Sequence, residues 1–197
     1  MTPLLLLRHA STQWNAERRI QGSTDIPLSA EGRAAAAGWR LPAEFKDYRW
    51  VASPLGRAME TARLMGAKPK IERRLVEMDW GQWEGLLSDE LEQRFPQAIE
   101  ESARLGVDFR RPGGESPRDV QQRLQPWLAS LTQPTAAVTH QGVITATHAL
   151  AAGWNMVGKP PVKLARFAAH LFMIDAGGAP SVERLNIPLE VNGEANS

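Results

Sequence analysis

Two segments far apart in the sequence each bring ionisable side chains to the end of an apolar run. Residues 4–7 are followed at once by Arg8 and His9, and residues 136–139 are followed by His140. Short unbroken apolar runs are typical of strands that are buried on both faces of a parallel sheet. Because ligands bind at the carboxyl ends of such strands, these side chains are candidates for a single active site.

Arg57 is a third candidate, on a third strand–helix unit. The sequence predicts a strand at residues 50–52, then a helix with Ser53 as N-cap and Pro54 at its first position, running to about residue 66. Arg57 then lies in the first helical turn, where backbone N–H groups and the dipole favour an anion. Guanidinium groups match phosphate oxygens in pairs, so this set of arginines and histidines indicates a site for a phosphoryl group.

Phosphoryl transfer also needs a nucleophile and a proton source. A neutral imidazole attacks phosphorus well when its other ring nitrogen is held by a hydrogen bond. Glu77 is the best-placed carboxyl group to protonate the leaving alkoxide, and Glu84 is the competing candidate. General acid catalysis of this kind contributes about 10²–10⁴-fold. A nearby phosphate dianion raises the pKa of such a carboxyl group and keeps it protonated.

The elements that must position these residues alternate between strands and helices. This order predicts an α/β fold: a three-layer α/β/α sandwich whose mostly parallel central sheet has helices on both sides. We expect one domain over residues 1–191, with residues 86–131 as a helical insertion over the site and residues 192–197 as a frayed tail. The remaining expected elements are a helix from Ser29 to Pro42, a strand at 71–76, helices at 86–106 (interrupted at Pro96), 116–131 and 142–152, and strands at 166–175 and 182–187.

Composition narrows the class of protein. The chain has 197 residues, 43% of them hydrophobic, and a formal net charge of +1, which gives no reason to expect nucleic acid or an acidic membrane as partner. It has no cysteine, so a disulfide framework and a thiolate metal site are excluded. No apolar run approaches ~18 residues, the length of a membrane span. We expect a cytoplasmic protein. Its oligomeric state is left open, with a homodimer among the alternatives.

Five motifs between residue 4 and about residue 145 give a family resemblance. They are Leu6-Leu7-Arg8-His9 with Trp14-Asn15, Gln21-Gly22 and Asp25; Ser53-Pro54-Leu55 with Arg57-Ala58 and Glu60-Thr61-Ala62; Leu75 and Glu77 with Trp83-Glu84-Gly85; Pro112-Gly113-Gly114-Glu115-Ser116; and Val138-Thr139-His140. In this order they resemble the histidine phosphatase superfamily, the phosphoglycerate mutase-like group. Trp83-Glu84-Gly85 and the compact 86–131 region are more typical of its phosphatase branch than of its mutases.

The resemblance implies roles for individual residues. His9 would be the nucleophile that becomes phosphohistidine, and Glu77 the proton donor that later acts as base for water. The phosphate clamp would consist of charged and amide side chains: Arg8, Arg57, His140, Asn15 and Gln21. Such a site needs no metal and no cofactor. His148 and His170 are expected to be structural, and Trp80 and Trp83 to pack rather than to line the site.

The resulting hypothesis is a phosphomonoester hydrolase acting on a small phosphorylated metabolite. Phosphoglycerate mutase-type transfer and non-catalytic binding of a phosphorylated ligand are the alternatives. The second alternative rests on Ala10, where the family usually has glycine, and on Gln141, where a small residue is common. A position that needs φ > 0 would penalise Ala10. Substrate selectivity is expected in residues 11–25 and 86–114.

Overall fold

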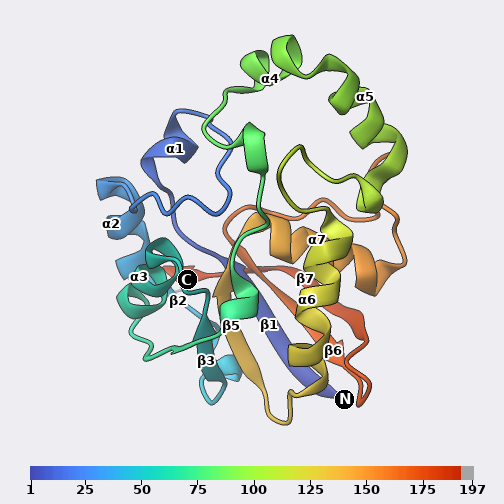
Figure 1. Cartoon of the computed structure of the whole chain (residues 1–197). Helices are drawn as coiled ribbons and strands as arrows, with labels where there is room; N and C mark the ends of the chain where they lie inside the picture. The colour runs from blue at the N-terminus through green and yellow to red at the C-terminus, as the bar shows by residue number, and fades with distance from the viewer. Residues whose placement is uncertain (192–197) are drawn as a thin grey trace.

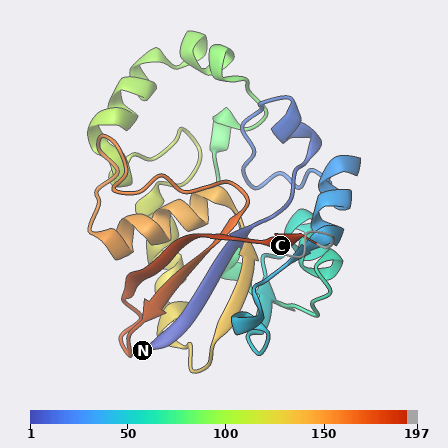
Figure 2. The same ribbon diagram turned by 180° about the vertical axis from the view of Figure 1, so that it is seen from behind.

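The computed structural model describes residues 1–191, and a six-stranded mixed sheet forms its centre (Figures 1 and 2). Its strands, in spatial order, are β4 (Lys70–Ile71), β3 (Arg49–Ala52), β5 (Thr135–Thr139), β1 (Thr2–Arg8), β6 (Ala168–Ile174) and β7 (Pro180–Pro188). The first four are parallel to one another, and β6 and β7 are antiparallel additions at one edge. β2 (Trp39–Arg40) and β8 (Glu190–Val191) pair separately. The predicted fold class is confirmed.

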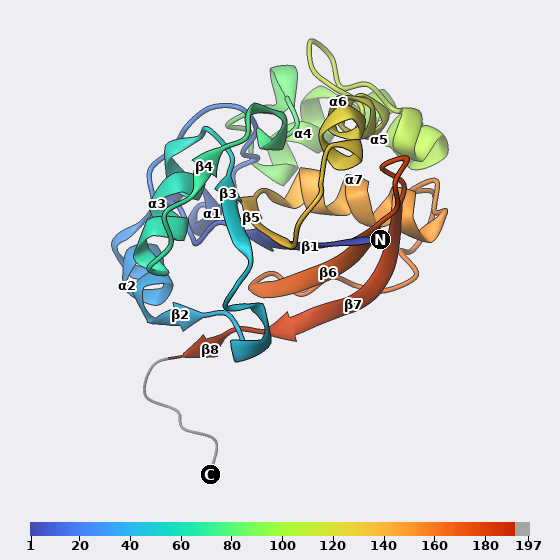
Figure 3. The same cartoon turned by 90° about the horizontal axis from the view of Figure 1, so that it is seen from below.

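The leucine run of β1 is unbroken because helices cover both faces of the sheet. Leu5 and Leu7 pack in one core cluster, and Leu4 and Leu6 in the other. Full burial of one such side chain stabilises the fold by ~1.5–3 kcal/mol. The first cluster includes residues of α2 (Ala30–Gly38) and α3 (Gly56–Leu64), and the second includes residues of α6 (Pro117–Ala129) and α7 (Gln141–Ala152). Figure 3 shows these helices from below.

An arch of two helices stands above the carboxyl ends of the parallel strands (Figures 1 and 2). It consists of α4 (Ser88–Arg94) and α5 (Pro96–Leu105), and α6 returns the chain to the side of the sheet. The other short elements are α1 (Gln13–Ala16), η1 (Ala43–Phe45), η2 (Arg73–Leu75), η3 (Gly81–Trp83) and η4 (Gly106–Asp108). The predicted domain limits remain a prediction, and the predicted tail, residues 192–197, lies outside the described residues.

Three predicted elements differ from the structure. Ser53 is not an N-cap: α3 begins at Gly56, whose N–H donates to the Asp25 carboxylate at 2.6 Å. The cap is thus supplied by a distant loop. The predicted strand at 71–76 is mostly the 3-10 helix η2: the Glu72 side chain accepts the Arg74 N–H, and Thr139 Oγ1 donates to the Leu75 carbonyl at 2.8 Å. The helix expected to reach Pro42 ends at Gly38, before β2.

The remaining predicted elements form within one to three residues of their expected limits. Within residues 1–191, no helix combines the length and apolar character that crossing a membrane requires.

Candidate active site

His9 lies directly beyond β1 and is 2% exposed. Its Nδ1 is 2.7 Å from the Ala10 carbonyl oxygen. A carbonyl only accepts, so Nδ1 carries the proton of the neutral ring and Nε2 keeps its lone pair. Burial, followed by the charges of Arg8 and Arg57, holds the pKa of His9 well below its ordinary value. The ring is therefore neutral at pH 7, with one nitrogen oriented and the other nucleophilic.

His140 brings a second ring to the same point. β5 ends beside β1, with Arg8 in register with Thr139, and the two imidazole centroids are 5.1 Å apart. His140 Nε2 is 2.7 Å from Ser53 Oγ, and its buried Nδ1 has no partner among the described residues. Burial, with the neighbouring charges of His9 and Arg57, keeps the pKa of His140 well below its ordinary value.

Glu77 is a buried carboxyl group, 5% exposed, at the N-terminus of α7. Its Oε2 accepts the Gly142 N–H at 3.2 Å, and its Oε1 accepts the Met78 N–H at 2.7 Å. A Cβ on Gly142 would lie 2.5 Å from Oε1, so only glycine allows this approach. Burial raises the pKa of Glu77, and these hydrogen bonds only partly oppose it. The environment is that of a carboxyl group that retains its proton above its ordinary pKa.

Arg57 is the largest fully buried side chain among the described residues, at 1% exposed. Its terminal nitrogens donate to the Thr24 and Gly22 carbonyls, each at 2.7 Å, and the Asp25 carboxylate is 3.5 Å away. Its Nε has no partner in the described chain. The guanidinium is thereby fixed while still offering N–H groups to an anion.

A cavity of about 320 Å³ lies at the carboxyl ends of the strands. Its lining includes four of the predicted site residues: Arg8, Asn15, Gln21 and Glu77. Gln21 Oε1 accepts from Thr12 Oγ1 at 3.1 Å and from Asn15 Nδ2 at 3.4 Å, whereas its buried Nε2 has no partner in the described residues. Asn15 Oδ1 accepts the Thr12 N–H within the capping box of α1. Gln21 thus keeps an unpartnered amide donor.

The seven predicted site residues form two layers. Arg8, Asn15, Gln21 and Glu77 face the cavity, whereas His9, Arg57 and His140 are almost fully buried and are not part of its lining. Glu84 does not join them as a proton donor, because its carboxylate accepts the N–H groups of Ser23 and Thr24. Trp80 packs against a core cluster, as expected, but also lines the cavity, and Trp83 is buried as expected.

Sequence reasoning missed four arginines around this site, among them Arg19, which also lines the cavity. Arg111 and Arg166 line the cavity. Arg123 donates to the Val76 carbonyl at 2.7 Å and pairs with Glu115 at 3.1 Å, which fixes the segment that carries Glu77. Nothing in local sequence distinguishes these from surface arginines, apart from the position of Arg111 beside the Pro112-Gly113-Gly114 motif.

Neither departure from the family pattern removes a chemical group from the site. Ala10 is not among the described residues with positive φ, so its methyl group causes no backbone strain. Its N–H donates to Thr61 Oγ1 at 3.0 Å. Gln141 lines the cavity and donates to Thr145 Oγ1 at 3.2 Å.

Comparison with known proteins identifies the family. The family model described as histidine phosphatase superfamily (branch 1) matches residues 4–188. The chain belongs to this superfamily. One relative of this chain, the probable phosphoglycerate mutase GpmB of Salmonella paratyphi C, is 36% identical over 136 residues. The match covers 66% of this chain and 63% of that relative, so less than two thirds of its length is spanned.

Solved structures share the fold over nearly the whole chain. TTHB049 from Thermus thermophilus is 30% identical, with a TM-score of 0.71 and coverage of 94% of this chain and 99% of that one. A mycobacterial glucosyl-3-phosphoglycerate phosphatase, solved with VO3, is 26% identical, with a TM-score of 0.77 and coverage of 95% and 100%.

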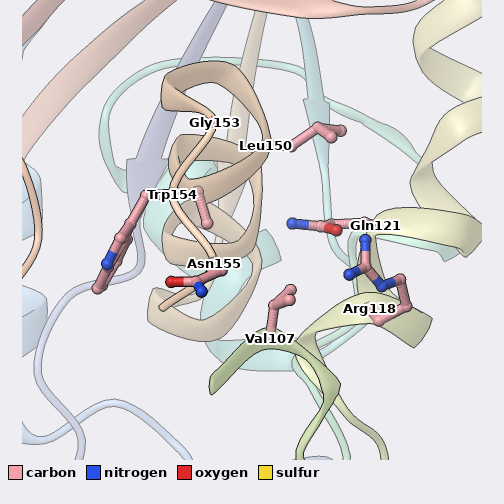
Figure 4. Close-up of a pocket in the computed structure, with 8 residues that line it drawn as sticks. Val107, Arg118, Gln121, Leu150, Gly153, Trp154 and Asn155 are labelled. Atoms are coloured by element: carbon pink, nitrogen blue, oxygen red, sulfur yellow. The ribbon is translucent and has the colours of Figure 1, made fainter. Parts of the chain in front are cut away.

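A second hollow of about 230 Å³ lies away from the histidines, between η4, α6 and the end of α7 (Figure 4). Three of its polar side chains already have partners. Arg118 pairs with Asp108 at 2.8 Å, Gln121 donates to the Ala146 carbonyl at 3.0 Å, and Trp154 Nε1 donates to the Val157 carbonyl at 3.1 Å. No described residue of this lining has a buried side-chain polar atom without a partner, unlike Arg8, Arg57 and His140.

Proposed function

We propose that this histidine phosphatase is a phosphomonoester hydrolase that acts on a small phosphorylated metabolite through a phosphohistidine at His9. The observation that carries the proposal is the hydrogen bond from His9 Nδ1 to the Ala10 carbonyl, 2.7 Å, in a ring kept neutral by burial and by two arginines. It leaves Nε2 as the nucleophilic atom. Free N–H groups of Arg8, Arg57 and Gln21 supply the positive environment that a phosphoryl group needs.

In the first step, His9 Nε2 forms a bond to phosphorus and the bond to the leaving oxygen breaks. Glu77 gives its proton to that oxygen, so the alcohol departs neutral. In the second step, water attacks phosphorus, the P–N bond breaks, and the Glu77 carboxylate accepts a proton from the water. Arg8 and Arg57 stabilise the charge on the phosphoryl oxygens in both steps.

Trapping of the intermediate tests this proposal. Protein quenched during turnover of p-nitrophenyl phosphate is expected to carry one phosphoryl group that is labile to acid and stable to alkali. His9→Ala abolishes the adduct, whereas His170→Gln, a change at a buried histidine outside the site, retains it. An adduct that persists in His9→Ala moves the nucleophile elsewhere. Tight binding of vanadate with no turnover of any phosphomonoester would favour a non-catalytic binding protein instead.

Phosphoglycerate mutase-type transfer is the second candidate, favoured by the name of the 36% identical relative. The two reactions share the phosphohistidine and differ in the acceptor of the phosphoryl group. Incubation with 3-phosphoglycerate separates them. A hydrolase releases inorganic phosphate, and a mutase forms the 2-phospho isomer with little phosphate release.

A further inference from the structure

Two arginines line the active-site cavity without a role in the proposed reaction: Arg111 and Arg166. Neither forms an ion pair with a carboxylate among the described residues. Arg19, which also lines the cavity, is different, because its Nε pairs with Glu17 at 2.8 Å. Besides Arg8, the cavity thus has two arginines with no carboxylate partner among the described residues.

Arg111 is almost fully buried, at 7% exposed. Its guanidinium carbon lies 4.4 Å from the centre of the Trp80 ring, 5.7 Å from that of Phe109 and 5.9 Å from that of Trp83. Its Nε has no partner in the described chain, and its one hydrogen bond, to the Phe109 carbonyl, is long at 3.4 Å. Aromatic faces offset part of the cost of burying a charge but leave the N–H edges unsatisfied.

Arg111 is charged under physiological conditions, because burial lowers its pKa only to about 10. Arg166 lies near Arg8 and His9, because its charge lowers the pKa of both groups. Its charge is the second cause, after burial, that lowers the pKa of Arg8 to about 10. Its own side chain is exposed at the cavity rim.

The positive charge around this cavity exceeds what one phosphoryl group requires. A phosphoryl dianion matches Arg8 and Arg57, the two arginines beside His9. Glu77 is the one carboxyl group in the described lining, and its raised pKa favours the neutral form. Arg111 and Arg166 then remain without a counterion unless the bound molecule supplies one.

We propose that Arg111 and Arg166 form a second anion subsite, and that the substrate is a small phosphomonoester that carries a second anionic group, either a carboxylate or another phosphoryl group. The cavity, about 320 Å³, is near the lower end of the range for small-molecule sites, ~300–1,000 Å³, which suits a compact metabolite. This proposal rests on the proposed function, because the second group is placed relative to a phosphoryl group at His9.

Matched pairs of substrates test the subsite. 3-Phosphoglycerate and glycerol 3-phosphate share the phosphoryl group and the three-carbon chain and differ in the carboxylate. Fructose 1,6-bisphosphate and fructose 6-phosphate differ in a second phosphoryl group. In the wild-type protein, kcat/KM for phosphate release is expected to be at least tenfold higher for the acidic member of one pair. The pair that shows the preference identifies the second group.

Three variants assign the preference to residues. Arg111→Met, which keeps an apolar stem against the rings, and Arg166→Met are each expected to lower kcat/KM about tenfold for the preferred acidic substrate. Turnover of glycerol 3-phosphate stays within about twofold. Arg110→Met is the control, because the neighbouring Arg110 pairs with Asp119 at 2.6 Å and does not line the cavity. Circular dichroism checks the fold of each variant. If Arg111→Met does not fold, the kinetics of Arg166→Met, a change at an exposed side chain, and the substrate preference of the wild-type protein test the subsite.

Equal turnover within both pairs would overturn the subsite while the proposed function stands. An equal loss for members with and without the second anionic group in Arg111→Met and Arg166→Met would overturn it too, because these arginines would then serve the phosphoryl group itself. If no compound is turned over, the proposed function fails, and calorimetric binding of the same four compounds still tests the subsite. Tighter binding of the acidic members, lost in Arg166→Met, supports it, and equal binding overturns it.

Discussion

The Glu84 carboxylate accepts a hydrogen bond from the backbone N–H of Ser23 at 2.6 Å, across 61 residues of sequence. The other carboxylate oxygen accepts the Thr24 N–H at 3.0 Å. The carbonyls on either side of Ser23, those of Gly22 and Thr24, in turn accept from the Arg57 guanidinium. A Cβ on Gly22 would lie 2.0 Å from Glu84 Oε1, so the approach requires glycine. Glu84 therefore positions Arg57 through this loop without contacting it.

Glu84→Gln is expected to weaken substrate binding more than chemistry. The amide offers one acceptor oxygen in place of two, and hydrogen bonds to a charged group contribute ~1.5–3 kcal/mol. We expect KM for p-nitrophenyl phosphate to rise about tenfold, equivalent to ~1.4 kcal/mol, while kcat changes by less than about threefold. Steady-state kinetics measure both. Glu100→Gln, on the exposed side of α5, is the control. A loss confined to kcat would contradict the positioning role.

Glu77→Gln is expected to distinguish substrates by their leaving group. An alkyl phosphate needs a proton on the departing oxygen, so its kcat/KM falls ~10²–10⁴-fold. p-Nitrophenyl phosphate, whose phenolate departs without a proton, loses far less. Glu72→Gln, in the same segment and paired with Arg74 at 2.7 Å, serves as control. Equal losses for the two substrates would exclude Glu77 as the acid.

The same variant defines the pH dependence. Because burial raises the pKa of Glu77, its proton is present below that raised pKa and is lost as pH increases through it. The alkyl phosphate profile of the wild-type protein therefore has a falling limb on the basic side that Glu77→Gln lacks. The lowered pKa of His9 keeps its ring unprotonated, and so nucleophilic, on the acidic side of the profile as well. There, kcat/KM shows no fall centred near the ordinary histidine pKa of about 6.5.

Strand ends could be located from the sequence because their signal is local. The leucines before Arg8 are apolar without alternation, and that pattern is typical of a strand buried on both faces of a sheet, as observed. His140 follows the same rule on β5. Topology then brings the two strand ends together, and this is why the central histidines could be predicted.

The cavity wall could not be predicted, because irregular segments supply it. Arg111 and Arg166 lie between regular elements, where no periodicity fixes the path of the chain. The predicted start of α3 was wrong for a related reason. The carboxylate that accepts its first N–H belongs to Asp25, a residue remote in sequence, and Ser53 Oγ lies against His140 instead. Local capping rules weigh only neighbouring residues.

Ala10→Gly, which restores the usual family residue, is expected to cost stability without a gain in activity. The backbone at this position does not need glycine, and the Ala10 methyl group is fully buried. Loss of that methyl group and the added chain entropy together lower the free energy of unfolding by ~1–2 kcal/mol. Urea unfolding measures the loss, and kcat/KM is expected to stay within about twofold. A tenfold rise in kcat/KM would show that Ala10 restricts the site.

His170 is expected to make stability depend on pH. Burial, with the charge of His148, lowers its pKa from 6.5 to about 4, and its Nδ1 accepts the Asn186 N–H at 3.2 Å. Between these pKa values the unfolded chain binds the proton and the folded chain does not, so stability falls as pH decreases from 7 to 5. Titration of His170 alone lowers the free energy of unfolding by ~2 kcal/mol between pH 7 and pH 5. Glu77 acts in the opposite sense, because its raised pKa favours the protonated folded state.

Comparison of His170→Gln with the wild-type protein isolates this contribution. The glutamine retains an acceptor for Asn186 and does not titrate, so the decrease in Tm between pH 7 and pH 5 becomes smaller. Met173→Leu, a change on the same strand without a titratable group, keeps the wild-type decrease. Thermal unfolding by circular dichroism at both pH values gives the answer. An unchanged pH dependence in His170→Gln would mean that the folded protein already binds a proton at His170. It would contradict the assignment of a neutral, buried His170 with a lowered pKa.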